Sequence, residues 1–177
     1  ISAYETNKVS RKKDGLTMNT DGPERKFYGF DSFEEGFKIF DKSDEHPSWI
    51  DGNLTSSYEK TKKRIKKNLK NSDFKLIKGF VENTCKDIDT KVYGINKISM
   101  AFFDMDLGSP TLIGLEFIKN SLNVGSIIAF DEYYAYKGSL KGEYYAFEKF
   151  RENNKQLEFR KFKNWGINGM SFIVTKI

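Results

Sequence analysis

The stretch KISMAFFDMDLGSPTL, residues 97–112, decides the expected fold. Its first half is an almost continuous apolar run, which is typical of a parallel strand that is covered on both faces. Two acids, Asp104 and Asp106, close this run. Ser109 and Pro110 come next, and they favour the start of a helix as its cap and its first residue. The stretch therefore predicts a strand that ends in acids and leads into a helix, the repeating unit of an α/β sheet.

The same pattern repeats on both sides of this stretch. Strands are expected at residues 26–31, 74–80, 97–104 and 124–132, and helices at 56–72, 84–96, 109–122 and 142–153. Residues 156–177 contain two further strand patterns joined by a Trp-Gly-Ile-Asn-Gly loop. The alternation predicts a mainly parallel α/β sheet with an antiparallel hairpin at its C-terminal end. We expect a single domain over residues 1–177.

The composition limits the classes of function. Hydrophobic residues make up 38% of the chain, which is enough for a core, and no apolar run approaches the roughly 20 residues of a membrane span. The single cysteine, Cys85, fits a reducing compartment, and we expect a cytoplasmic protein. The net charge of +5 is interpreted as surface lysine, so nucleic acid is not the expected partner.

Acids stand where several of the expected strands end. Asp31, Asp104 and the pair Asp131 and Glu132 would lie at the carboxyl edge of the sheet, where α/β proteins bind ligands. Ends of neighbouring strands are about 5 Å apart. Carboxylates at that distance repel one another, and a bound Mg²⁺ or Mn²⁺ would relieve the repulsion. The alternative is that these acids are helix caps and surface charges.

An Asp-x-Asp pair after a strand also occurs in other enzyme classes. The phrase FDMD resembles the nucleophile motif of phosphatases of the haloacid dehalogenase type, but Leu107 stands where that motif has glycine. Sugar-nucleotide glycosyltransferases carry an Asp-x-Asp that binds a metal ion, and their motif tolerates these neighbours. A metal-dependent glycosyltransferase is therefore kept as the alternative enzyme.

Four motifs in order resemble a wider pattern. FYGFDSFEEGF, KLIKGFVENT, ISMAFFDMDLGSPTLIGLEFI and VGSIIAFDEYYAYKGSLKGEYYAFEKFRE lie between residues 27 and 152. Together they resemble the macrocin-type (TylF-like) sugar O-methyltransferases. The resemblance implies a Rossmann-like class I S-adenosylmethionine (SAM) methyltransferase sheet whose last strand pair is antiparallel. It also implies a first strand and a Gly-rich loop, which the 177 residues do not show.

The resemblance places cofactor contacts on particular residues. Asp31, with Ser32 beside it, would hold the ribose hydroxyls of SAM, since a carboxylate can accept two hydrogen bonds. Gly79 and Phe80 would lie near the adenine. Asp104 is also expected within the cofactor site.

The resemblance also assigns the chemistry. Asp104, Asp131 and Glu132 would ligate Mg²⁺ or Mn²⁺, with Glu132 standing where the family has a second aspartate. Asp106 would be the general base that removes the proton of the acceptor hydroxyl. Its alternative role is the N-cap of the following helix.

Three further features of the sequence are interpreted with the acceptor site in view. Residues 32–56 form a long irregular excursion, which we expect to act as a lid or substrate loop. The only histidine, His46, lies within it and is expected to be a surface residue. Tyr133, Tyr134 and Tyr136 would either line the acceptor site or cover the core.

The expected function is a metal-dependent SAM O-methyltransferase that acts on a hydroxyl of a sugar or a glycosylated small molecule. The alternatives are the glycosyltransferase and a degenerate, non-enzymatic binding domain. The expected partners are a small-molecule or carbohydrate acceptor and a second copy in a homo-oligomer, with no membrane.

Overall fold

The computed structural model describes residues 26–45, 49–69, 73–136 and 141–177, so His46 lies outside the described residues. The strands are β1 (Phe27–Asp31), β2 (Phe74–Lys78), β3 (Met100–Phe103), β4 (Ile127–Phe130), β5 (Glu158–Trp165) and β6 (Gly169–Lys176). The α-helices are α2 (Tyr58–Asn68), α3 (Val81–Thr84), α4 (Gly108–Ile118) and α5 (Gly142–Asn153). Short 3₁₀ helices are η1 (Phe33–Glu35), η2 (Lys42–Asp44), η3 (Thr90–Tyr93) and η4 (Lys119–Ser121).

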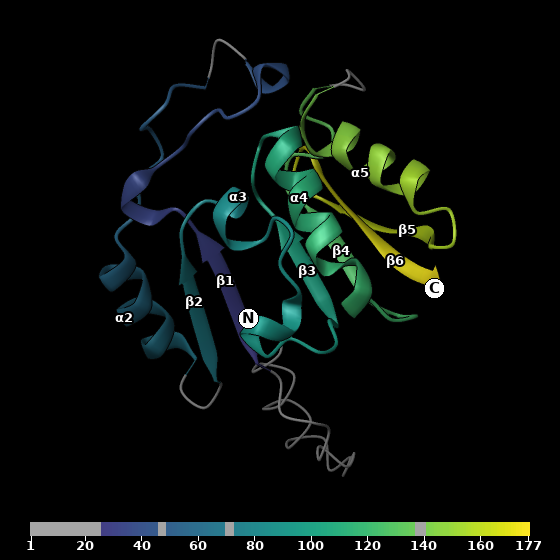
Figure 1. The fold of residues 1–177 in the computed structure, drawn as a ribbon, viewed down its shortest axis with the longest axis horizontal. Helices are drawn as coiled ribbons and strands as arrows, with labels where there is room; N and C mark the ends of the chain where they lie inside the picture. The colour runs from purple at the N-terminus through teal and green to yellow at the C-terminus, as the bar shows by residue number, and fades with distance from the viewer. Residues whose placement is uncertain (1–25, 46–48, 70–72, 137–140) are drawn as a thin grey trace.

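The strands form two groups that lie side by side (Figure 1). β1 and β2 are parallel, and the second group has the order β3-β4-β6-β5. β3 and β4 are parallel, whereas β6 is antiparallel to both β4 and β5. The predicted α/β fold, with parallel strands and a C-terminal antiparallel hairpin, is confirmed. Among the described residues, no strand joins the two groups into one continuous sheet.

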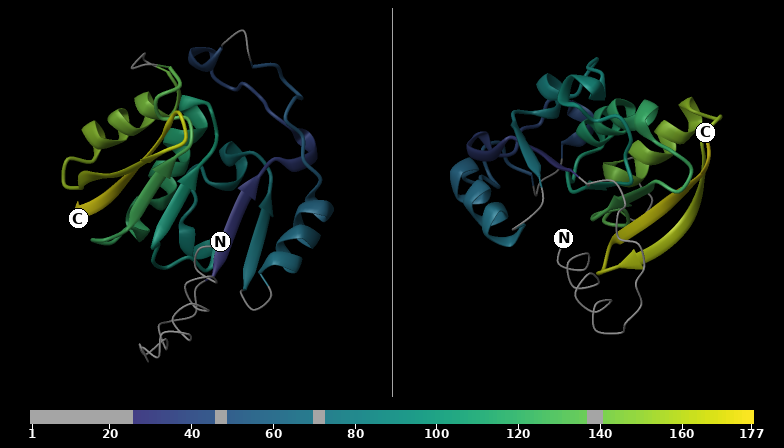
Figure 2. Two further views of the ribbon diagram at one scale, coloured as in Figure 1. Left: turned by 180° about the vertical axis from the view of Figure 1, so that it is seen from behind. Right: turned by 90° about the horizontal axis from the view of Figure 1, so that it is seen from below.

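The core lies between one face of the four-stranded sheet and the helices α4 and α5 (Figure 2). Strand side chains alternate between faces, so Ile128 and Phe130 of β4 both point towards these helices and are fully buried. Phe147 of α5 is also fully buried, and its ring lies 4.5 Å from that of Phe172 in β6. This aromatic packing fixes α5 against the four-stranded sheet.

The opposite face of this sheet differs from the prediction for β3. Met100 and Phe102 keep 58% and 53% of their surface exposed. The expectation of a strand covered on both faces is therefore wrong for the described residues. Helices α4 and α5 both lie on the other side of this sheet, and the ring of Phe102 packs near that of Trp165, with ring centroids 6.1 Å apart. The apolar run in the sequence of β3 predicted that the strand is buried, but it did not show which elements would cover each face of the strand.

Helix starts follow the sequence in part. The sequence offers Ser56 or Ser57 as the cap of α2, and in the structure the cap is Ser57, whose hydroxyl accepts from the backbone N–H of Lys60 at 3.4 Å. The next helix begins three residues earlier than predicted, at Val81. α4 begins at Gly108, and Ser109 is not its cap. The cap comes instead from a distant segment, as described below.

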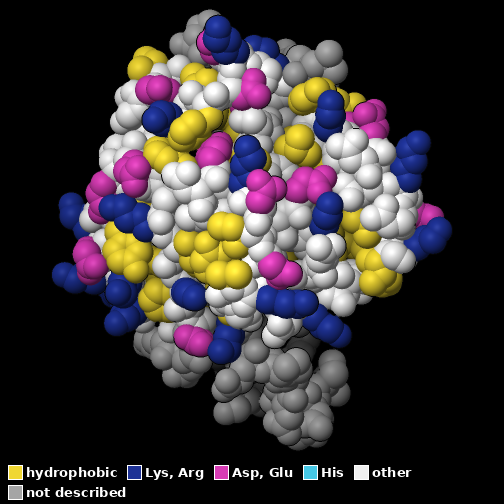
Figure 3. Space-filling view, in the orientation of Figure 1, with side chains coloured by type: hydrophobic (Ala, Val, Ile, Leu, Met, Phe, Trp, Pro, Cys, Tyr) yellow, Lys and Arg dark blue, Asp and Glu magenta, His cyan; other side chains and the backbone are white. Residues whose placement is uncertain are grey.

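The described parts of the excursion, residues 32–45 and 49–56, contain η1 and η2 and arch over the carboxyl ends of the strands at the top of Figure 1. Lysine and arginine side chains gather over α2 at the left edge of Figure 3, and charges of both signs are mixed over the rest of that face. No helix in the described ranges has the length and apolar character needed to cross a bilayer.

Candidate active site

The expected acids meet at one edge of the strands. The N–H of Asp131 donates to the carbonyl of Phe103 at 3.0 Å, so Asp104 and Asp131 follow paired positions of β3 and β4. Asp31 ends β1 and is close enough for its charge to act on Asp104. The sequence therefore placed these acids at the correct edge, because the ends of parallel strands share one side of a sheet.

The cluster of acids perturbs its own ionisation. Burial raises the pKa of Asp104, and the charges of Asp131, Glu132 and Asp31 raise it further. Burial likewise raises the pKa of Asp106 to about 6, with Asp104 as the next cause. Within the part of the chain that the structure describes, none of these acids forms an ion pair. The edge is thus a concentration of negative charge, which favours a cationic ligand.

The three expected metal ligands are neighbours but have other partners. Asp131 accepts from the indole N–H of Trp165 at 3.4 Å, and Glu132 accepts from the side-chain amide of Asn168 at 2.9 Å. Over the described ranges, no group of three or more His, Cys, Asp or Glu side chains is arranged to hold a metal ion. Metal ligation by Asp104, Asp131 and Glu132 stays a prediction that rests on their oxygen donors and their mutual repulsion.

Asp106 is not a helix cap. Its backbone is left-handed, with φ of 60°, and the N-cap position of α4 belongs to Leu107, whose side chain cannot accept a hydrogen bond. The Asp106 carboxylate accepts no hydrogen bond from any described residue. A half-buried carboxylate without a bonded donor and with a pKa near 6 has the properties of a general base.

The cap of α4 comes from the excursion. Asp44 is 5% exposed, and its two oxygens accept from the N–H groups of Gly108 at 2.8 Å and Ser109 at 3.0 Å. A carboxylate is favoured there, because free N–H groups and the helix dipole meet at a helix start. Sequence reasoning missed Asp44, since its partners lie more than sixty positions away and no local motif marks it.

Two more contacts tie the excursion to the segment that follows β4. The indole N–H of Trp49 donates to the hydroxyl of Tyr136 at 2.5 Å, and the Lys141 ammonium donates to the carbonyl of Glu45 at 2.6 Å. Tyr136 therefore lies under the excursion. Tyr133, in contrast, is 4% exposed and belongs to the core, so for this residue the prediction that it covers the core is confirmed.

The expected cofactor residues lie together at the ends of β1 and β2. One oxygen of Asp31 accepts from the N–H of Phe33 at 2.5 Å, and the side chain is exposed. The N–H of Gly79 donates to the carbonyl of Asp31 at 2.9 Å. Gly79 has a φ of 137°, which a residue with a side chain rarely adopts. The hydroxyl of Ser32 donates to the carbonyl of Gly36 at 2.6 Å, so it also holds the local turn.

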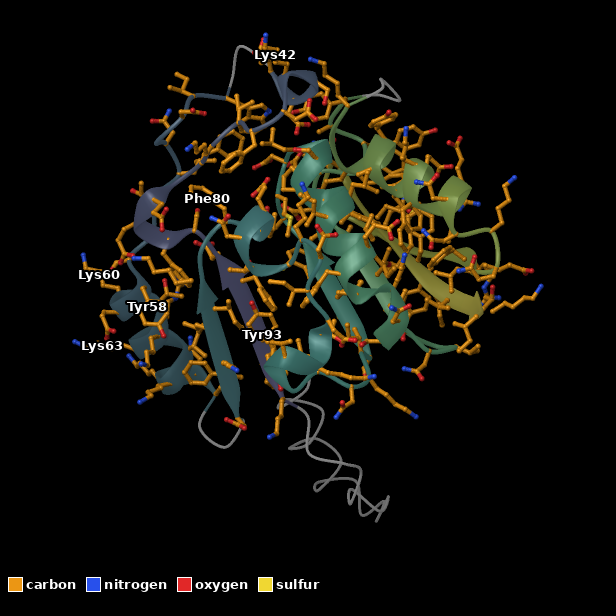
Figure 4. The ribbon with its side chains drawn as sticks, in the orientation of Figure 1. Lys42, Tyr58, Lys60, Lys63, Phe80 and Tyr93 are labelled. Carbon is orange, nitrogen blue, oxygen red and sulfur yellow. The ribbon has the colours of Figure 1, made fainter. Side chains whose placement is uncertain are left out.

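Phe80 lies beside these ends, where β2 runs into α3 (Figure 4). Its ring packs edge-on against Phe40 of the excursion, with centroids 5.1 Å apart. An aromatic face at this place is suited to stack on a flat base. The adenine role of Phe80 and the ribose role of Asp31 stay predictions.

A second residue that sequence reasoning missed is Glu143, in the first turn of α5. It is fully buried and accepts from the backbone N–H groups of Met105 and Glu132. The sequence offered one weak signal, an acid in the first turn of a predicted helix, which is ordinary on a surface. Its burial follows only from how α5 packs.

Comparison with known proteins shows which fold this chain has. The chain matches no protein-family model, and no curated protein is significantly similar to it in sequence. Its structure is similar to that of the O-methyltransferase NovP, with a TM-score of 0.66 and 15% identity over 95% of this chain. The chain has the fold of a methyltransferase.

Two structures of CalS11 are also similar. The apo structure, of a TDP-rhamnose 3′-O-methyltransferase in calicheamicin biosynthesis, has a TM-score of 0.57 and 25% identity over 88% of this chain. The other, described as a calicheamicin methyltransferase, has a TM-score of 0.60 and 23% identity over 95% of this chain. The matches cover 64% of NovP and 61% and 66% of CalS11, so this chain spans less than two thirds of the length of these proteins.

Proposed function

We propose that this protein is a SAM-dependent O-methyltransferase that acts on a hydroxyl of a sugar or a glycosylated small molecule. The observation that carries the proposal is Asp106, a carboxylate with a pKa near 6 and no bonded donor among the described residues, at the carboxyl edge of a methyltransferase fold. The similarity to CalS11, which methylates TDP-rhamnose, supports a sugar acceptor. The ordered motifs of the sequence support the same family.

Each part of the edge has a role in this reaction. Asp31 would accept hydrogen bonds from the ribose hydroxyls, and Gly79 and Phe80 would face the adenine. When bound, SAM would supply an electrophilic methyl group on a positively charged sulfur, and the acidic edge would favour that charge. Asp106 would take the proton of the acceptor hydroxyl. The excursion would exclude water from the acceptor, because it already contacts α4 and Tyr136.

A divalent cation fits the chemistry of this edge. Asp104, Asp131 and Glu132 offer only oxygen donors, which suit Mg²⁺ or Mn²⁺. A cation held there would lower the pKa of the acceptor hydroxyl and orient it towards Asp106. We include this metal in the proposal, together with a small-molecule or carbohydrate acceptor, a homo-oligomeric assembly and a cytoplasmic location.

Calorimetry with SAM on the full-length protein tests the proposal. We expect binding, and we expect Asp31→Asn to weaken it by about tenfold or more, because one charged hydrogen-bond acceptor is lost. Asp73→Asn is the matched control, since Asp73 is an exposed acid that precedes β2, at the opposite end of that strand. Absence of SAM binding at millimolar ligand, together with Mn²⁺-dependent binding of a nucleotide-sugar, would establish the glycosyltransferase alternative.

A second measurement tests the chemistry. With TDP-rhamnose as the probe acceptor, we expect formation of S-adenosylhomocysteine that stops in EDTA and resumes with Mg²⁺. Asp106→Asn should lower kcat by about 10²- to 10⁴-fold, the usual contribution of a general base. Activity that is indifferent to EDTA would remove the metal from the proposal, and activity that survives in Asp106→Asn would remove the base.

A further inference from the structure

Glu143 joins the two loops that carry the acids. One of its oxygens accepts from the N–H of Met105 at 3.1 Å, and the other accepts from the N–H of Glu132 at 2.9 Å. Met105 lies in the β3–α4 loop, residues 104–107, and Glu132 lies in the segment that follows β4. A single side chain of α5 therefore connects both parts of the acidic edge.

A carboxylate in this place is costly. Glu143 is 0% exposed, and burial raises its pKa to about 7, although both N–H donors oppose that rise. The nearby charges of Asp106 and Asp104 raise it further. The start of α5 offsets part of this cost through its helix dipole. An apolar side chain would bury its surface there without a charge to desolvate, so packing alone does not account for a glutamate.

The two backbone amides that Glu143 binds explain why a glutamate stands at this position. Met105 lies between Asp104 and Asp106, so fixing its N–H restrains both acids. The backbone of Asp106 is left-handed, with φ of 60°, a conformation that residues with a side chain seldom adopt, although aspartate adopts it more often than most. The fixed amide of Met105, directly before it, helps to hold this conformation. Glu132 is fixed in the same way on the other loop. The two loops thus keep one relative position.

The start of α5 is shaped for this contact. Gly142 precedes Glu143 and has a φ of 65°, and a Cβ atom there would collide with the ring of Tyr136. The same Cβ would lie 3.4 Å from the carbonyl oxygen of Asp106. Glycine therefore lets the helix begin directly against the β3–α4 loop, within reach of the Met105 amide.

We propose that Glu143 is a positioning residue that fixes the β3–α4 loop to the segment after β4 and thereby sets the placement of Asp106. This inference rests on the proposed methyl transfer for its catalytic consequence. The connection between the loops can be measured without any activity.

The first experiment uses ¹H–¹⁵N NMR spectra of the full-length protein and its Glu143→Gln variant at pH 8, above the pKa of about 7 of Glu143. Glutamine has the same shape but can accept only one of the two hydrogen bonds. We expect the amide signals of Met105 and Glu132 to move upfield, because a bond to a carboxylate is replaced, and the signal of Asp106 to move with them. Glu152→Gln, an exposed acid of the same helix, is the control and should leave all three signals in place. Unchanged Met105 and Glu132 signals would overturn the connection, and an unchanged Asp106 signal would overturn the positioning role.

The second experiment separates positioning from folding. In Glu143→Gln we expect kcat to fall by about 10- to 100-fold, the usual effect of a displacement near 1 Å, with the KM of the acceptor and the SAM affinity little changed. Glu143→Asp is one methylene shorter and should not restore kcat, since it cannot reach both amides. If Glu143→Gln keeps the wild-type kcat, Glu143 does not position Asp106. If the wild type transfers no methyl group to any acceptor, the proposed function fails, and the NMR signals still decide whether Glu143 holds the loops.

Discussion

Replacing Asp106 with asparagine should make the protein more stable at neutral pH. Burial and the charge of Asp104 raise the pKa of Asp106 from 3.8 to about 6. The unfolded chain therefore ionises this group more readily than the folded one, so stability is lost as the pH rises from about 4 to about 6. Asparagine carries no charge, keeps the shape and tolerates the left-handed backbone at this position.

The magnitude follows from the pKa. A rise from 3.8 to about 6 corresponds to about 3 kcal/mol above pH 6, and roughly half of this remains after allowance for solvent around a half-buried group. We therefore expect Asp106→Asn to raise the free energy of unfolding by about 1 to 2 kcal/mol at pH 8, which is about 3 to 6 °C in Tm for a chain of this size. The gain should shrink steadily below pH 6.

Urea denaturation between pH 4 and pH 8, in EDTA and without SAM, measures this effect. Asp87→Asn is the matched control, because Asp87 is exposed and also has a left-handed backbone, with φ of 57°. We expect no gain from it at any pH. A gain that is equal at pH 4 and pH 8, or no gain at pH 8, would refute the reasoning that Asp106 is held in an unfavourable charged state.

Three further predictions concern other parts of the molecule. Asp44→Ala should cost about 1 to 2 kcal/mol in urea denaturation, because α4 loses its cap, whereas Asp41→Ala, which uncaps only the short η2, should cost less. Phe147→Ala should cost about 3 to 5 kcal/mol by the same assay, since a fully buried ring leaves a cavity. Lys60 and Lys63 point outwards from α2 (Figure 4). Reversing both charges should change the rate of methyl transfer by less than about twofold, because exposed charges are screened by salt. A large loss of rate would show that α2 contributes to substrate binding.

The sequence predicted that the acids lie at one edge of the sheet, because each acid directly follows an apolar strand pattern and parallel strands end at the same edge. The apolar run before Asp104 and the run before Asp131 identified two neighbouring parallel strands, and both acids lie at the same edge. The same reasoning failed for the far face of β3. An apolar run shows that a strand is suited to burial, but Phe102 is covered only if another element packs on it.

The tertiary structure decided which distant residues complete the edge. Asp44 caps α4 across 64 positions, and Glu143 binds Met105 across 38. Such bonds depend on how the excursion and α5 pack, and no local periodicity encodes them.

The sequence by itself thus determined the order of the elements, the acids at the strand ends and the cap of α2. These features follow from side-chain alternation and from hydrogen bonds between near neighbours, which a short stretch of chain contains. Only the tertiary structure decided that Asp106 has a pKa near 6 and accepts no hydrogen bond from any described residue, and that a buried glutamate holds its loop. Burial and charge repulsion arise from groups brought together in space, so they exist only once the fold has formed.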